Sequence, residues 1–211
     1  MKKSSSSKAE PRIRRPPAVA RREIVEAARA EIEESSDGRI SVSAVMRRVG
    51  MRQSSFYHYF KSLDEVILEL LLDLEADVKD AVEPWLQGRQ TSTDRREDTV
   101  VHLTAMLAAG RRHRRVLSAA IRAANSSEKI YSQWKSRILD FYFDQAKEFI
   151  EKQVEEGRSN VSDPASAARA LVFMNFGAWM DDLWRDNPTS PSELGRTVGS
   201  VWNDVIYGNA P

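Results

Sequence analysis

Apolar residues recur at helical spacing along almost the whole chain from Val19 onward. Ile24, Ala28 and Ile32 fall on one face of the first such segment, and the same period of three to four residues returns in every later one. No stretch alternates apolar and polar residues over the length of a half-buried strand. The sequence therefore predicts an all-α fold of about nine helices. None of the apolar runs approaches the roughly 18 residues of a membrane span, so no membrane partner is expected.

Glycine, proline and capping residues divide this pattern into segments. The predicted helices cover residues 19–34, 41–49, 55–60, 63–88, 100–110, 114–124, 128–156, 164–187 and 191–206. Residues 1–18 are basic, polar and interrupted by proline, which predicts a disordered arm. We expect residues 19–79 to form one domain and residues 80–211 to form a second.

Charge is segregated along the chain, although the 211 residues together carry a net charge of only +1. Residues 1–22 carry +7, residues 23–37 carry −5, residues 38–63 carry +5 without a single acid, and the remainder carries −6. Acidic side chains repel phosphates, so their absence from one segment beside an acidic neighbour indicates a surface that faces nucleic acid. The plainer alternative for any charge run is a solvated face.

Several other classes of protein are excluded by missing residues and motifs. The chain has no cysteine, so it has neither disulfides nor thiolate zinc sites. It also lacks a glycine-rich phosphate loop, an H-E-x-x-H motif and a nucleophile elbow. We therefore expect no enzyme, no cofactor and no metal site. The basic N-terminus lacks the apolar stretch of a secretory signal, so a cytoplasmic protein is expected.

Residues 40–66 carry the most specific pattern in the chain. They predict two short helices joined by a tight turn at Gly50, which is a helix-turn-helix. The stretch closely resembles the DNA-binding region of the TetR (tetracycline-repressor-like) regulators. The matching positions, in register, are Ser41, Val45, Gly50, Met51, Ser55, Phe56, Tyr57, Phe60, Ser62 and Val66. Met46 departs from the alanine of the family pattern, and Leu63 departs from its phosphate-contacting lysine.

The helix-turn-helix suggests which side chains meet double-stranded DNA. Recognition helices read base edges with their first residues, here Arg52, Gln53, Ser54 and Ser55, and glutamine can pair with adenine. Either serine could instead be a helix N-cap. The resemblance adds Tyr57 and His58 as phosphate or base contacts, with Lys61 compensating for Leu63. Ser41 and Ser43 begin the preceding helix, a usual place for a phosphate.

The basic arm has two readings of its own. It is either a solubilising tail or a segment that contacts the minor groove or the DNA backbone.

The second domain is rich in aromatic side chains at helical spacing, which either fill the core or surround an apolar ligand. The set comprises Trp85, His102, Met106, Tyr131, Trp134, Phe141, Tyr142, Phe173, Asn175, Phe176 and Trp179. We expect ligand contacts from His102, Trp134, Tyr142, Asn175 and Trp179. A ligand-controlled domain should hold a cavity of a few hundred Å³.

The TetR resemblance implies a repressor that a small hydrophobic ligand releases from a palindromic operator. The alternatives are a ligand-independent or protein-controlled DNA-binding regulator and, from another class, an all-α enzyme. The last two helices, about 164–186 and 191–207, offer apolar faces for a homodimer. Two polar clusters, Arg111–Arg115 and the pair Asp181 and Asp182, are expected to lie in solvent.

Overall fold

The computed structural model describes residues 16–35, 38–86 and 94–208. Within these ranges the chain forms nine α-helices, one short 3₁₀ helix and one π-helical turn, with no strand. The all-α prediction is thus confirmed. The predicted arm falls mostly on residues 1–15, which lie outside the described residues, and the first helix begins one residue before the end predicted for that arm.

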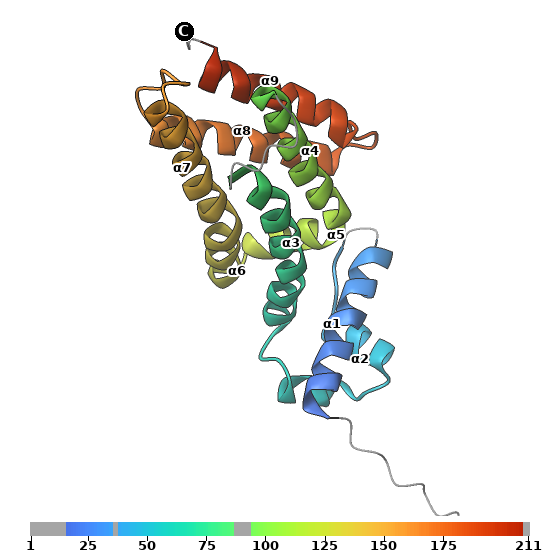
Figure 1. The fold of residues 1–211 in the computed structure, drawn as a ribbon. Coiled ribbons are helices and arrows are strands. Elements are labelled where there is room, and N and C mark those ends of the chain that lie inside the picture. The colour runs from blue at the N-terminus through green and yellow to red at the C-terminus, as the bar shows by residue number, and fades with distance from the viewer. Residues whose placement is uncertain (1–15, 36–37, 87–93, 209–211) are drawn as a thin grey trace, which may run out of the picture.

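The helix-turn-helix head contains α1 (Pro17–Glu34), α2 (Val42–Val49) and η1 (Gln53–His58). Figure 1 shows the head at one end of the molecule, with α1 and α2 in blue. Gly50 ends α2 with φ of 73°, and its N–H donates to the carbonyl of Arg47. This left-handed conformation suits glycine because it has no Cβ.

Helix α3 (Leu63–Leu86) runs from the head into the second domain (Figure 1). Its N-terminal half contributes Val66 and Leu70 to the same buried core as Phe56 of the head, and Val78 lies further along in the second domain. The predicted domain boundary at residue 79 therefore falls inside α3. The two predicted domains share this helix.

The remaining helices form the second domain, called here the regulatory domain. They are α4 (Arg95–Arg112), α5 (Arg114–Ala124), α6 (Glu128–Trp134), α7 (Phe141–Glu155), α8 (Pro164–Trp184) and α9 (Pro191–Tyr207). Helix α4 packs closely along α9, where Gly195 and Gly199 leave room for Thr104 and Val100. In Figure 1, α8 and α9 lie together at the end of the molecule opposite the head.

The single helix predicted over residues 128–156 is wrong in one respect. Residues Lys135–Asp140 form a π-helical turn, η2, between α6 and α7. A π turn shifts the register of the helix faces that follow it, but one such turn hardly disturbs an apolar pattern read over nearly thirty residues. The turn matters here because Ile138 and Leu139 face a small cavity described below.

Candidate nucleic-acid interface

The N-terminus of α2 presents two exposed serines. Ser41 is the N-cap, and its Oγ accepts a hydrogen bond of 3.2 Å from the N–H of Ala44. The Oγ atoms of Ser41 and Ser43 lie 3.0 Å apart. No acid stands in the first turn of the helix. Hydroxyls together with the partial positive charge of a helix N-terminus suit a phosphate oxygen, as expected for these two residues.

The recognition element is the six-residue 3₁₀ helix η1 rather than an α-helix. Phe56 and Phe60 are buried, with ring centroids 5.7 Å apart, and they anchor η1 to the core. Tyr57, in contrast, is 61% exposed. The two phenylalanines therefore belong to the core, and η1 turns most of its other residues outward.

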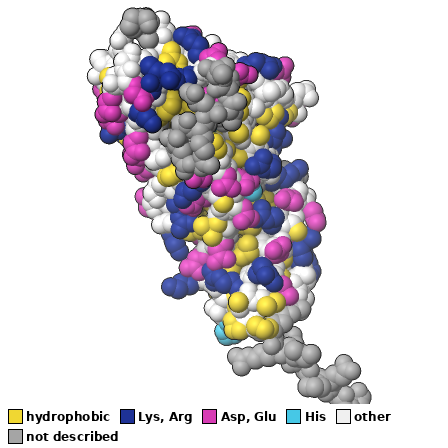
Figure 2. Space-filling view, viewed as in Figure 1, with side chains coloured by type: hydrophobic (Ala, Val, Ile, Leu, Met, Phe, Trp, Pro, Cys, Tyr) yellow, Lys and Arg dark blue, Asp and Glu magenta, His cyan; other side chains and the backbone are white. Residues whose placement is uncertain are grey.

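The predicted base-reading residues lie together on this outward side. Arg52, Gln53, Ser54 and His58 are exposed, and Ser55 is half-buried. The N-cap residue of η1 is Arg52, and its side chain makes no capping hydrogen bond. The alternative that Ser54 or Ser55 caps this helix is therefore wrong. Figure 2 shows apolar side chains and a histidine at the tip of the head.

The two departures from the family pattern have clear structural consequences. Met46 is fully buried in the core. Leu63 is half-buried and packs against the same core. Lys61 has an exposed side chain, while its backbone N–H donates to Oε2 of Glu65 at 2.9 Å. This hydrogen bond is the main reason that the pKa of Glu65 is lowered. The Lys61 ammonium is thus placed on the surface beside η1.

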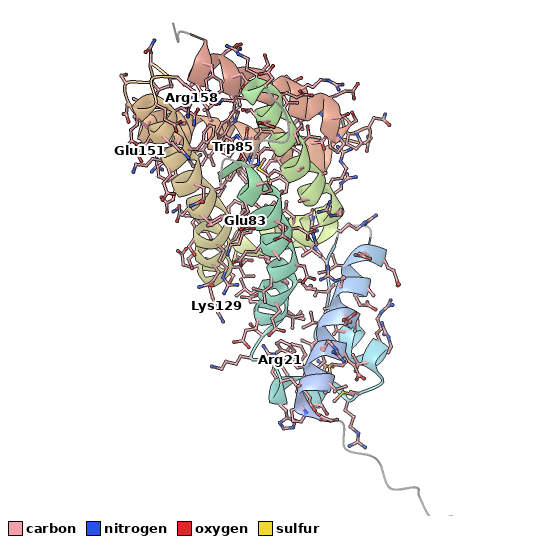
Figure 3. The ribbon with its side chains drawn as sticks, in the orientation of Figure 1. Arg21, Glu83, Trp85, Lys129, Glu151 and Arg158 are labelled. Carbon is pink, nitrogen blue, oxygen red and sulfur yellow. The ribbon has the colours of Figure 1, made fainter. Side chains whose placement is uncertain are left out.

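Two arginines that contribute to the positive charge of the N-terminal part form ion pairs with acidic side chains. Arg48 donates hydrogen bonds to Glu31 and Glu34 of α1. Both hydrogen bonds raise the pKa of the Arg48 guanidinium, and the one to Glu34 contributes most. Arg21 binds Glu69 of α3 and the carbonyl of Tyr59. Figure 3 shows Arg21 where α1 meets the start of α3. Sequence reasoning missed the positioning role of both residues, since charge counts do not reveal pairing.

In the regulatory domain, three of the five predicted ligand contacts line one cavity. Tyr142, Asn175 and Trp179 line this cavity together with apolar side chains. The apolar side chains are those of Val78, Met106, Ile138, Leu139, Val172 and Phe176. Its volume is about 20 Å³, room for one water molecule. The cavity lined by these predicted residues is therefore far smaller than the few hundred Å³ expected, and the hollow of about 280 Å³ in this domain lies elsewhere, between residues 160–163 and α9.

The other aromatic residues considered for ligand binding lie elsewhere in the regulatory domain, some in its core and some on its surface. Trp134 lines a neighbouring crevice and packs against Phe176, with ring centroids 5.1 Å apart. His102 lies behind Tyr142, stacked on Trp85. Tyr131 and Phe173 are 45% and 53% exposed, so they belong to the outer surface and not to a ligand site. Helical spacing alone does not say which face meets solvent.

The tautomer of His102 follows from its partners. Nδ1 lies 3.1 Å from the carbonyl oxygen of Ala81, which can only accept, so Nδ1 carries the proton. Nε2 therefore accepts the hydrogen bond from the Tyr142 hydroxyl at 3.0 Å. Burial lowers the pKa of His102 to about 4. Burial also raises the pKa of Tyr142, and the side chain of Asn175 partly offsets this rise. Both groups are neutral at pH 7.

Comparison with known proteins agrees with this geometry. Residues 24–70, which span α1, α2, η1 and the start of α3, match the family model described as bacterial regulatory proteins, tetR family. The helix-turn-helix head is thus of the TetR type. It is 25% identical over 194 residues to the HTH-type transcriptional regulator EthR of Mycolicibacterium smegmatis, covering 89% of this chain and 86% of that protein.

Several solved structures of transcriptional regulators share the fold. A TetR-family regulator from Mesorhizobium loti superposes with a TM-score of 0.70 at 18% identity, covering 92% of this chain and 100% of that one. A TetR regulator from Haloarcula marismortui gives 0.69 at 17% identity, with 90% and 98% covered. A transcriptional regulator from Saccharomonospora viridis, solved in complex with choline, gives 0.67 at 18% identity, with 90% and 98% covered.

The chain is accordingly a DNA-binding transcriptional regulator with a TetR-type head. Among its described helices, none is long and apolar enough to cross a membrane. The described part of the chain also holds no group of three or more His, Asp or Glu side chains that could bind a metal ion.

Proposed function

We propose that this chain is a homodimeric repressor of the TetR type that binds a palindromic operator through η1 and the N-terminus of α2. The observation that carries the proposal is the exposure of Ser41, Ser43, Arg52, Gln53 and Lys61, all of which belong to a segment, residues 38–63, that contains no acid. Arg52 and Gln53 open η1, where a recognition helix reads base edges, and Ser41, Ser43 and Lys61 suit phosphates.

The test of sequence-specific binding is a selection from random duplex DNA with the purified chain. A dimer with one head per half-site should enrich a palindrome whose half-sites are about 10 bp apart, or a multiple of that spacing. Enrichment of a single, unpaired half-site would contradict the dimeric mode. Enrichment of no sequence would contradict operator recognition altogether.

The exposed apolar residues of the last two helices support the homodimer. Phe173 of α8 is 53% exposed, and Val201 and Val205 of α9 are 40% and 42% exposed. A monomer gains nothing from leaving such side chains in water, whereas a two-fold pairing of α8 and α9 with their copies would bury them. Such a dimer also gives the two heads a fixed spacing on DNA.

Sedimentation tests this surface directly. We expect the chain to sediment at micromolar concentration as a dimer, at twice its 23.9 kDa. Replacing Phe173 and Val205 by glutamate should yield monomers, because burying unpaired like charges is costly. Leu72→Glu, at a 45% exposed position on α3, is the matched control and should leave the dimer intact. A monomeric wild type would exclude the proposed pairing.

We further propose that a small apolar ligand carrying a hydrogen-bond acceptor releases the operator. One N–H donor that lines the cavity, Nε1 of Trp179, reaches hydrogen-bond geometry with no other group of the described residues. A buried donor without a partner costs free energy, which an acceptor on the ligand would recover. Because the cavity is only about 20 Å³, the ligand must displace side chains to enter.

The small cavity also favours a second candidate, a regulator without a ligand or one controlled by a protein. Tryptophan fluorescence separates the two. The chain would be titrated with pairs of neutral molecules of equal length, such as a fatty methyl ester and the matching alkane. Ligand control predicts saturable binding that prefers the ester, and Trp179→Phe should reduce that preference. Unchanged fluorescence with every probe would favour the second candidate.

A further inference from the structure

The recognition element η1 depends on other elements for its position. It is a 3₁₀ helix of six residues, and its N-cap residue makes no capping hydrogen bond from its side chain. Helices of this type are short because their hydrogen-bond geometry is poorer than that of an α-helix. The orientation of η1 therefore depends on the contacts that hold its two ends.

Arg21 of α1 makes such a contact at the C-terminal end of η1. Its Nη1 donates a hydrogen bond to the carbonyl of Tyr59, the C-cap residue of η1. The guanidinium carbon lies 3.9 Å from the centroid of the buried Phe60 ring, which stacks on Phe56. The last carbonyls of a helix lack partners within that helix, and an arginine can supply them. Arg21 therefore caps η1 from a different helix.

Helix α3 holds the Arg21 side chain in this place. Nε of Arg21 donates to Oε1 of Glu69 at 2.8 Å, and Nη2 donates to the same oxygen. A guanidinium is a rigid planar fork, so fixing one edge on Glu69 also fixes the direction of Nη1 toward Tyr59. Figure 3 shows Arg21 where α1 meets the start of α3. One side chain thus joins α1, α3 and the end of η1.

These bonds leave Arg21 poorly suited to bind DNA itself. Its charge is paired with Glu69, and Nε, Nη1 and Nη2 each donate to a protein oxygen. Arg52 and Gln53, in contrast, are exposed at the opposite end of η1. A tilt of η1 about its buried phenylalanines would move these two side chains. Hydrogen bonds to base edges weaken steeply with misalignment, so such a tilt would cost base recognition.

We propose that Arg21 is a positioning residue for base reading. It fixes the C-terminal end of η1 and thereby the place of Arg52 and Gln53, so it sets the selectivity of DNA binding without touching DNA. The proposal rests on the proposed reading of the operator by η1. Phosphate contacts, such as those of Ser41 and Ser43 on α2, carry no sequence information. Loss of the Arg21 contact should therefore lower selectivity and not the affinity for DNA in general.

Arg21→Lys tests the proposal, because lysine keeps the charge and lacks the planar fork. Selectivity is the ratio between the Kd for an unrelated duplex and the Kd for the operator obtained by selection. We expect it to fall at least about fivefold, which corresponds to the weaker of the usual base contacts. The affinity for the unrelated duplex and its slope against salt should stay as in the wild type. Unchanged selectivity would overturn the proposal.

Glu69→Gln separates positioning from a direct phosphate contact, because the two roles predict opposite results. Positioning predicts a loss of selectivity like that of Arg21→Lys, since Arg21 is no longer held. A phosphate contact predicts tighter binding to every duplex with a steeper dependence on salt, since an acid beside the cation is removed. The second result would contradict the proposal.

Arg29→Lys is the matched control. Arg29 binds Asp73, so it joins the same two helices, α1 and α3, about two turns further along α1. This variant should keep the selectivity of the wild type. A loss equal to that of Arg21→Lys would show that any weakened pairing of α1 with α3 lowers selectivity, which would contradict a specific role of Arg21.

Amide hydrogen exchange without DNA distinguishes this proposal from the proposed function. The N–H groups of Tyr59 and Phe60 donate to the carbonyl of Phe56 at 2.9 and 3.0 Å. Relative to the amide of Val45 in α2, their exchange should accelerate at least about fivefold in Arg21→Lys, and the control variant should show no change. Unchanged exchange would overturn the proposal even if the operator is bound. Faster exchange in a chain that selects no DNA sequence would remove only the proposed function.

Discussion

At the scale of single residues, charge alone does not say which arginine or lysine faces DNA. Arg48 and Lys61 both belong to the acid-free segment, yet Arg48 is held by two glutamates of α1 while the Lys61 ammonium stays exposed. The sequence identifies the surface because acids are missing from it. It cannot identify the pairing, because Glu31 and Glu34 come from another helix.

This pair of residues gives a direct prediction. Lys61→Gln should weaken binding to all DNA sequences alike and reduce the slope of log K against log salt by roughly 0.9, the value for one phosphate contact. Arg48→Gln should leave the slope unchanged, since its guanidinium is already paired. Fluorescence anisotropy titrations between 50 and 200 mM salt, about the range over which such slopes are resolved, provide the measurement. Equal slopes for Lys61→Gln and wild type would show that Lys61 makes no phosphate contact.

Buried His102 gives a second prediction at this scale. Its pKa in the folded state is about 4, below its ordinary value of 6.5, so the unfolded chain binds more protons between these values. Stability is therefore complete above about pH 6.5 and falls as the pH drops toward 4. The slope is at most about 1.4 kcal/mol per pH unit, which gives about 2 kcal/mol between pH 6.5 and pH 5.

The check is urea unfolding of wild type and His102→Phe at pH 7 and pH 5. The variant should be less stable at pH 7, because the Tyr142 hydroxyl and the Ala81 carbonyl lose their partner. It should then lose about 2 kcal/mol less than wild type on acidification. Parallel losses would mean that His102 does not titrate as its burial implies.

At the scale of helices, the apolar period and the capping residues predict most of the elements. Ser41, Asp163 and Ser190 are N-caps in the structure, as the starts of the predicted helices indicate. The π turn and the 3₁₀ form of η1 could not be predicted, because each changes the register by less than the pattern resolves. Nor could the ion pairs of Arg111 and Arg112 at the end of α4, since their partners, Asp182 and Asp77, lie on α8 and α3.

The turn of the helix-turn-helix gives the prediction at this scale. At Gly50 a Cβ meets no atom within 4 Å, but φ is 73°, so the cost of a side chain is conformational and not steric crowding. Gly50→Ala should destabilise the chain by about 1 to 2 kcal/mol, and Gly50→Asn by less, because asparagine tolerates this conformation. Thermal unfolding measures both. Equal stability of Gly50→Ala and wild type would mean that this turn is not fixed by its conformation.

At the scale of the whole molecule, the net charge of +1 is the sum of opposed segments, and their signs follow the surfaces they form. The helices of the acid-free segment, α2 and η1, lie in the head, at the opposite end of the molecule from α8 and α9 (Figure 1). The sequence predicts this division because it follows chain order. The closed cavity was beyond sequence reasoning, since its volume depends on how Trp179 and Phe176 pack.

The most direct test of the central claim is to repeat the DNA selection with Gln53→Ala. Gln53 is exposed at the start of η1, where a recognition helix reads bases. If η1 reads the operator in a two-fold dimer, the selected motif should keep its palindromic symmetry and lose base preference at one matching position in each half-site. A motif identical to that of the wild type would contradict base reading by Gln53 at the start of η1.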